Sequence, residues 1–145
     1  MRIVLQRVSS AKVQINGQTA GEIGPGLLVY LSVSKGDGEQ QAKFIADKIA
    51  NLRVFEDDAG KMNLSVIDTG GQVLLISNFT LDGNCNKGRR PSFDNAAEPA
   101  KANKLYEQVC ELVEQAGIDV RRGIFQAHMH VSSVNDGPVT VIVEK

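Results

Sequence analysis

Cysteine is scarce in this chain of 145 residues, which contains only Cys85 and Cys110. The two are far apart in the sequence, and neither forms a C-x-x-C pair. A structural zinc site needs several closely spaced ligands, and a disulfide-rich fold needs several cysteine pairs. The sequence therefore excludes both classes, and we expect reduced thiols in a cytoplasmic protein.

Long apolar runs and a large net charge are absent as well. The first seven residues hold only three consecutive apolar side chains, too few for the core of a signal peptide. No segment approaches the roughly 18 apolar residues of a membrane span. Because the formal net charge is only −1, the whole molecule does not attract RNA as a strongly basic protein would. Any contact with RNA must come from a local patch.

The length and composition favour a single domain, residues 1–145. With 42% hydrophobic residues, the chain can bury one core and is too short for two ordinary domains. In the first half we expect strands at 3–8, around Val13 and Ile15, at 18–23 after the Asn16-Gly17 hairpin signal, and at 27–31. Apolar residues at helical spacing predict a helix over about 39–52: Ala42, Ile45, Ala46, Ile49 and Leu52.

The second half continues the mixture of strands and helices. A turn is expected at 57–60, a buried strand at 73–77 and a loop at 82–94. A second helix begins near Pro99 and ends at Gly117. Two strands follow, 120–134 with an internal break and 139–143, joined by a turn at 135–138. We therefore predict an α+β fold, a mixed and largely antiparallel sheet curled into a partial barrel with two packed helices.

Ser77-Asn78-Phe79-Thr80 follows directly on the apolar run of the strand at 73–77. Strand ends present hydroxyls and backbone N–H groups at the rim of a sheet, where they are available to a ligand. The alternative is that these hydroxyls only satisfy loop backbone. No G-x-S-x-G elbow surrounds Ser77, and neither His128 nor His130 belongs to a triad pattern, so a serine nucleophile is not indicated.

Two further groups of polar residues suggest binding sites. Lys87, Arg89 and Arg90 concentrate three cations on the loop at 82–94, where they could hold phosphates, although most basic loops are only solvated. His128 and His130 alternate along a predicted strand and would share a face, as a metal pair does. No third ligand of a suitable kind is near in sequence, so we expect no metal site.

In this order, the segments resemble the D-aminoacyl-tRNA deacylase family over essentially the entire chain. Each match is weak alone, whereas their joint occurrence at family-like spacing is specific. The matching segments are residues 1–8 with Gln6-Arg7-Val8, Gly21-Glu22-Ile23-Gly24 with Gly26-Leu27-Leu28, Leu52-Arg53-Val54-Phe55 with Gly60-Lys61-Met62-Asn63, residues 77–81, Arg90-Pro91-Ser92-Phe93, and residues 135–140.

The resemblance implies a cytoplasmic homodimer that hydrolyses D-aminoacyl-tRNA and mischarged glycyl-tRNA without a cofactor or metal. A cis Gly137-Pro138 bond would enter the neighbouring subunit's active site, where its carbonyls exclude L side chains. Asn78 and Phe79 would supply backbone N–H donors, and Ser77 and Thr80 pocket hydroxyls. The remaining implied site residues are Phe125 and Met129 near the terminal adenosine of the tRNA, and Lys87, Arg89 and Arg90 at phosphates.

One departure from the family pattern leaves two alternatives open. The family usually has Gln where this chain has Asn78, which is one methylene shorter. A relative with reduced turnover would bind the tRNA end without cleaving the ester. A sister deacylase with a trans Gly137-Pro138 bond would instead accept small L-amino acids.

Overall fold

A computed structural model describes the whole chain, residues 1–145. It holds two α-helices, a short 3-10 helix and a six-stranded sheet with a separate two-stranded ribbon. None of the helices is long and apolar enough to cross a membrane. In chain order the elements are β1 (Arg2–Ile15), β2 (Gln18–Ile23), β3 (Gly26–Ser32), α1 (Glu39–Asn51), β4 (Phe55–Glu56), β5 (Met62–Leu64), β6 (Gln72–Ser77), η1 (Phe79–Asp82), α2 (Pro99–Gln115), β7 (Val120–Arg122) and β8 (His130–Glu144).

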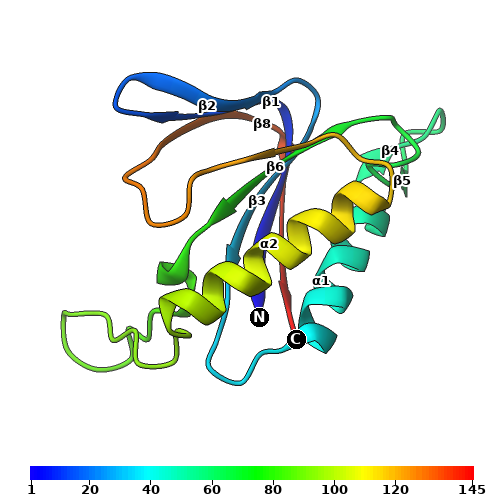
Figure 1. The fold of residues 1–145 in the computed structure, drawn as a ribbon. Helices are drawn as coiled ribbons and strands as arrows, with labels where there is room; N and C mark the ends of the chain where they lie inside the picture. The colour runs from blue at the N-terminus through cyan, green and yellow to red at the C-terminus, as the bar shows by residue number, and fades with distance from the viewer.

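The sheet is mixed, as predicted. Its order is β2-β1-β3-β6-β7, and β8 pairs with β1. The pairs of β1 with β2, β3 and β8 are antiparallel, whereas β3–β6 and β6–β7 are parallel. Parallel neighbours need a crossover, and α1 and α2 provide the two crossovers. Figure 1 shows both helices on the same side of the sheet, which confirms the α+β fold.

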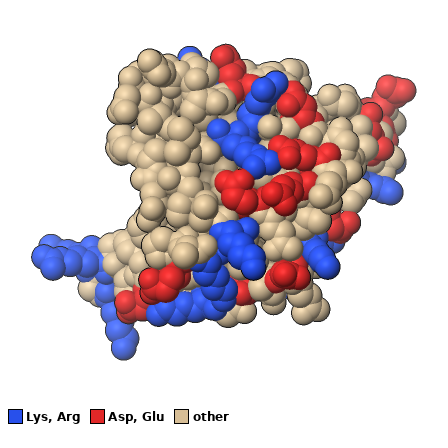
Figure 2. Space-filling view, viewed as in Figure 1, with Lys and Arg blue, Asp and Glu red and all other residues tan.

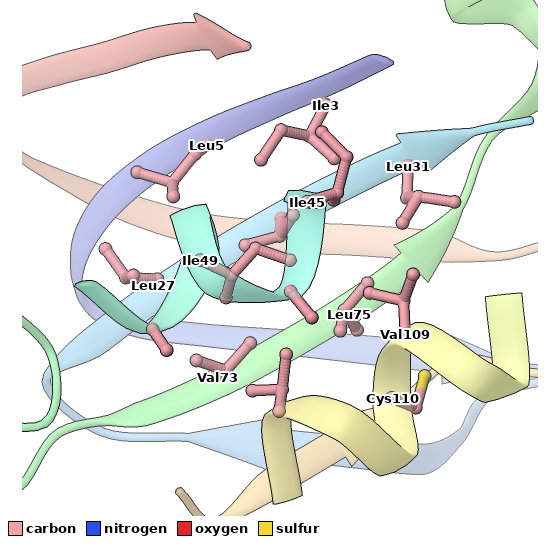
Figure 3. Packing of buried hydrophobic residues seen from close by; sticks show 14 of the residues in the cluster. Ile3, Leu5, Leu27, Leu31, Ile45, Ile49, Val73, Leu75, Val109 and Cys110 are labelled. Atoms are coloured by element: carbon pink, nitrogen blue, oxygen red, sulfur yellow. The ribbon is translucent and has the colours of Figure 1, made fainter. Parts of the chain in front are cut away.

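The main core lies between the helices and one face of the sheet. Val29 and Leu31 of β3 point to this face, and Leu75 of β6 does the same. Ile45 and Ile49 come from the predicted apolar stripe of α1, and Val109 and Cys110 come from α2 (Figure 3). Burial raises the pKa of the Cys110 thiol to about 12, so this side chain packs as a neutral apolar group.

A second, smaller core fills the inside of the curled sheet. Because side chains alternate along a strand, Leu28 of β3 and Leu74 and Ile76 of β6 point away from the helices and into this cluster. Gly21 of β2 lets the curl close, since a Cβ there would lie 3.1 Å from the carbonyl oxygen of Arg122 on β7. The predicted partial barrel is therefore present.

Both predicted helices are confirmed, and the break inside 120–134 falls between β7 and β8. The predicted turn at 135–138 that joins two strands is wrong. Residues 130–144 form one strand, and both halves of it pair with β1, as shown by Lys12↔Ser132 and Val4↔Ile142. The chain does not reverse at this segment. It bulges out opposite Arg7, because Gln6 pairs with Thr140 and Val8 with Asn135.

Candidate functional site

A cavity of about 730 Å³ lies at the carboxyl end of β6. It forms there because β3 and β6 are parallel and end at the same edge, whereas β7 is shorter and is followed by the connection 123–129. The cavity brings together all four residues of the predicted Ser77–Thr80 motif. Phe125 and Met129, the predicted adenosine walls, also line it.

Asn78 organises the turn at the rim of the cavity. It is the N-cap of η1, and its Oδ1 accepts hydrogen bonds from the Thr80 N–H at 3.3 Å and from the Thr80 hydroxyl at 2.6 Å. The expectation that Asn78 supplies a backbone donor is wrong, because its N–H donates to the carbonyl oxygen of Leu31 at 2.8 Å. Asn78 therefore shapes the turn through its side chain, while its N–H is hydrogen-bonded to β3 of the sheet.

Phe79 is the first residue of η1, and the residue is 57% exposed. A 3-10 turn leaves its first N–H groups without an acceptor inside the helix. The Asn78 side chain satisfies the N–H of Thr80, and the bonds within the turn are donated by Leu81 and Gly83. The Phe79 N–H is thus the donor that this cap leaves free for a ligand.

The walls of the cavity depend on residues that the sequence does not single out. A Cβ on Gly123 would lie 2.6 Å from the sulfur of Met129, so the glycine makes room for Met129 to fold inward. Phe125 contacts Tyr106 of α2, with ring centroids 6.4 Å apart. Tyr30 and Ser32 of β3 complete the floor. Met129 also packs against the core inside the barrel.

The lining contains no Asp, Glu, Lys, Arg or Cys side chain. Tyr30 and His128 are its only titratable residues, and burial raises the pKa of Tyr30, which keeps the phenol neutral. Such a cavity offers hydroxyls, the side-chain amides of Asn78 and Gln126, and backbone N–H groups. It therefore suits the binding and polarisation of a neutral acyl group better than proton transfer by a carboxylate.

The two histidines do not share a strand, contrary to the prediction. His128 lies in the connection before β8 and lines the cavity, whereas His130 is the first residue of β8. Their rings meet edge to face, with centroids 5.0 Å apart. No cluster of three or more His, Cys, Asp or Glu residues in the structure could hold a metal ion.

Gly137 and Pro138 lie in the bulge of β8, and the peptide bond between them is cis. Both residues are exposed, and neither lines the cavity of its own chain. Asn135 and Thr140 bracket the bulge. The Oδ1 of Asn135 accepts a hydrogen bond from the Val139 N–H at 3.1 Å, and its Nδ2 donates to the Thr140 hydroxyl at 3.0 Å.

Arg7 holds the bulge from below, a role that its sequence context does not indicate. Its side chain is only 8% exposed. The Nε donates to the carbonyl oxygen of Asp136 at 3.1 Å, and the Nη1 donates to the carbonyl oxygen of Val54 at 2.9 Å. One buried guanidinium thus connects the bulge to the segment that follows α1.

We expect Arg7→Ala to lower the free energy of unfolding by about 2 to 3 kcal/mol, since the buried carbonyl of Val54 loses its donor. Urea unfolding followed by circular dichroism measures the change. Arg121→Ala is the matched control, because Arg121 forms only an exposed pair with Asp119, and its loss should cost at most about 1 kcal/mol. Equal losses in the two variants would contradict the anchoring role of Arg7.

The predicted phosphate contacts Lys87, Arg89 and Arg90 are exposed and stand apart from the cavity lining. Their loop projects from the body of the molecule between η1 and α2 (Figure 1). An isolated bridge between Asn84 and Ser92 closes its base. The structure therefore places these cations outside the cavity. Only an extended ligand could contact the cavity and the loop cations at the same time.

Comparisons with known proteins show the family to which the chain belongs. The family model described as D-Tyr-tRNA(Tyr) deacylase matches residues 4–144. Proteins named D-aminoacyl-tRNA deacylase are similar along their whole length. That of Geobacter sulfurreducens is 56% identical over 144 residues, covering 99% of this chain and 95% of its own. That of Pelobacter propionicus is 54% identical over 145 residues, covering 100% of both.

Solved structures show the same fold. One described as c-Myc DNA Unwinding Element Binding Protein superposes with a TM-score of 0.94 at 36% identity, covering 100% of this chain and 99% of its own. Another, a probable eukaryotic D-amino acid tRNA deacylase, has a TM-score of 0.86 at 16% identity, covering 98% and 97%. At that identity the second likeness concerns the fold alone.

Proposed function

Because the chain belongs to the D-Tyr-tRNA(Tyr) deacylase family and is a D-aminoacyl-tRNA deacylase, we propose that it works as a homodimer in the cytoplasm, where it removes D-amino acids and glycine from tRNA. The observation that carries this proposal is the neutral cavity at the end of β6, with the free N–H of Phe79 at its rim. The selectivity would come from a partner subunit's Gly137-Pro138 bulge.

The cavity suits the aminoacylated adenosine at the tRNA end. Its volume of about 730 Å³ lies within the range of pockets that bind small ligands. Phe125 and Met129 offer apolar surfaces against which an adenine can pack. The ester would then lie toward Ser77 and Phe79, at the end of β6.

Hydrolysis of this ester needs little beyond positioning and stabilisation of charge. Water attacks the carbonyl carbon, negative charge develops on the carbonyl oxygen, and the bond to the ribose oxygen breaks as that oxygen takes a proton. We assign the Phe79 N–H as the donor to the developing oxyanion. The neighbouring ribose 2′-hydroxyl is placed to assist the attacking water, so no side-chain base is needed.

An apolar row that the single chain leaves partly uncovered supports the proposed homodimer. Ile142 of β8 is 67% exposed and pairs with Val4 of β1, which in turn pairs with Tyr30 of β3. Tyr30 lines the cavity, so the row leads from the free edge of β8 to the site. A second copy laid across the row would bury Ile142 and cover the cavity mouth.

The positions of the bulge and the cavity suit a two-fold dimer. The bulge lies opposite Arg7, three residues further along β1 than Val4, which is about 10 Å at the rise of a strand. A two-fold axis that passes between the level of the bulge and the level of the apolar row would bring each subunit's bulge to the partner's apolar row. The bulge would then meet the partner's cavity. Gly137 and Pro138 do not line the cavity of their own chain, so only the bulge of a partner subunit could select the substrate there.

Chiral selection is then a matter of occupied volume. Backbone carbonyls of the partner's bulge would stand where an L side chain must point, and they would leave space for a hydrogen. D-aminoacyl esters and glycyl esters would fit, whereas L-aminoacyl esters would collide with backbone that cannot move aside. Selection of this kind needs no side-chain chemistry, which suits a motif of glycine and proline.

The paired deacylation of D-Tyr-tRNA and L-Tyr-tRNA tests this function, with glycyl- and L-alanyl-tRNA as further substrates. We expect hydrolysis of the D-tyrosyl and glycyl esters only. Equal hydrolysis of both tyrosyl esters would overturn the selectivity, and cleavage of L-alanyl-tRNA would favour the sister deacylase. Binding of tRNA without cleavage of any ester would favour the relative with reduced turnover.

A further inference from the structure

The charges on the exposed side of α2 change sign along the helix. Lys101 and Lys104 lie exposed in its first turns, and Glu111 lies exposed two turns later. A helix dipole favours anions at the N-terminus, so the positive charge of Lys101 interacts unfavourably with the dipole of α2. Neither lysine forms an ion pair. Helix stability therefore does not account for these two lysines.

The backbone of Lys35 lies beside the Lys101 side chain, which adds a second exposed lysine to this region. The Nζ of Lys101 donates to the Lys35 carbonyl oxygen at 2.6 Å, and the Lys35 N–H donates to the carbonyl oxygen of Asn95. Both lysine side chains are exposed. The region therefore presents two exposed cationic side chains at the start of α2.

Together with the loop, these lysines form a cationic strip, defined as Lys35, Lys101 and Lys104 with Lys87, Arg89 and Arg90. Figure 2 shows basic side chains gathered over the lower left of this face, where the loop and the start of α2 lie in Figure 1, and acidic ones near the middle of α2. Three carboxylates lie in the same region: Asp82, which accepts from the Ser34 hydroxyl, Asp94, which accepts from the Ser92 hydroxyl, and Glu98 at the N-cap of α2.

The strip begins at the mouth of the cavity. Pro99 and Ala102, which flank Lys101 on α2, both line the cavity, as does Ala97. The net charge of the chain is −1, so the six cations of the strip with the three carboxylates make this region positive, whereas the remaining residues sum to a negative charge. An anion that enters the cavity and continues outward along α2 would meet the strip first.

We propose that the cationic strip binds the phosphates of the tRNA acceptor end, and that Lys101 and Lys104 extend the phosphate contacts from the loop to α2. This inference rests on the proposed function, since the aminoacylated adenosine must occupy the cavity. The chain of phosphates that leads away from that adenosine then follows the first turns of α2 and avoids Glu111. Sequence-independent contacts of this kind suit an enzyme that acts on many tRNAs.

The test uses the double variant Lys101→Glu/Lys104→Glu and two substrates, D-Tyr-tRNA and the D-tyrosyl ester of adenosine alone. We expect KM for D-Tyr-tRNA to rise about tenfold or more, because two attractive interactions with phosphates become repulsive. The dependence of log KM on log salt should flatten by roughly 0.7 to 0.9 for each phosphate that the variant no longer neutralises. KM for the adenosine ester should not change, since it has no phosphate.

The matched control is Lys43→Glu/Lys61→Glu, which makes the same charge change at exposed lysines on α1 and in the β4–β5 ribbon turn. It should leave KM for both substrates unchanged. An unchanged KM for D-Tyr-tRNA in the Lys101/Lys104 variant, or an equal rise for the adenosine ester, would overturn the proposal.

Failure of the proposed function gives a different result. Wild-type protein that cleaves neither ester would contradict the catalytic account. The Kd for uncharged tRNA then tests whether the cationic strip binds phosphates. A Kd raised about tenfold in the Lys101/Lys104 variant supports the strip, and an unchanged Kd overturns it.

Discussion

Replacing Phe79 by proline should lower kcat for D-Tyr-tRNA by about 10² to 10³, the usual cost of removing one oxyanion donor. Proline lacks the backbone N–H and is well tolerated at the first position of a helix, which Phe79 occupies in η1. The hydrogen bonds of the turn, donated by Leu81 and Gly83, do not use the Phe79 N–H. Single-turnover deacylation measures the decrease.

Phe79→Ala is the control for the loss of the ring. The Phe79 ring meets that of Phe93 edge to face, with centroids 5.1 Å apart, so both substitutions remove this contact. Only proline also removes the N–H. We expect alanine to retain kcat within about tenfold, and equal rates in the two variants would exclude the Phe79 N–H from catalysis.

Gly137→Val should lower kcat/KM for D-Tyr-tRNA by about 10²-fold, since an ångström of misplacement in a positioning group has a cost of that size. Gly137 has φ +130°, which L residues rarely adopt. A Cβ there would lie 2.8 Å from Cγ2 of Val139 and 3.2 Å from Nη2 of Arg7. The bulge must therefore shift away from its anchor, and hydrolysis of L-Tyr-tRNA should rise relative to the D ester.

The matched control for backbone strain is Gly60→Val. Gly60 also has positive φ, +72°, but it lies in the turn between β4 and β5 with open space around it. This variant should lose stability while each folded molecule keeps its activity and its preference for the D ester. If Gly137→Val behaves in the same way, the bulge has no part in selection.

The sequence predicted the helices and the strand end that lines the cavity because their signals are local. Ile45 and Ile49 recur at helical spacing, and the polar Ser77 to Thr80 segment interrupts an apolar run. The error at 135–138 has a physical cause. Asn, Asp, Gly and Pro favour hairpin turns and strand bulges alike, and only the pairing of both halves with β1 separates the two.

Other parts of the site depend on contacts between distant segments. An arginine in a strand is usually exposed, so Arg7 gave no sign that it is buried beneath the bulge. Tyr30 and Ser32 reach the cavity only because β3 lies beside β6. For the same reason, the N–H of Asn78 donates a hydrogen bond to the carbonyl oxygen of Leu31, and no local sequence pattern could show this bond.

Mixing the Phe79→Pro and Gly137→Val proteins tests most directly whether one subunit's bulge completes the other's site. After subunits exchange, a mixed dimer holds one site with both defects and one with neither. If half of the dimers are mixed, D-Tyr-tRNA deacylation should recover to about a quarter of the wild-type rate. A mixture no more active than its separate components, with exchange verified, would contradict a site shared between subunits.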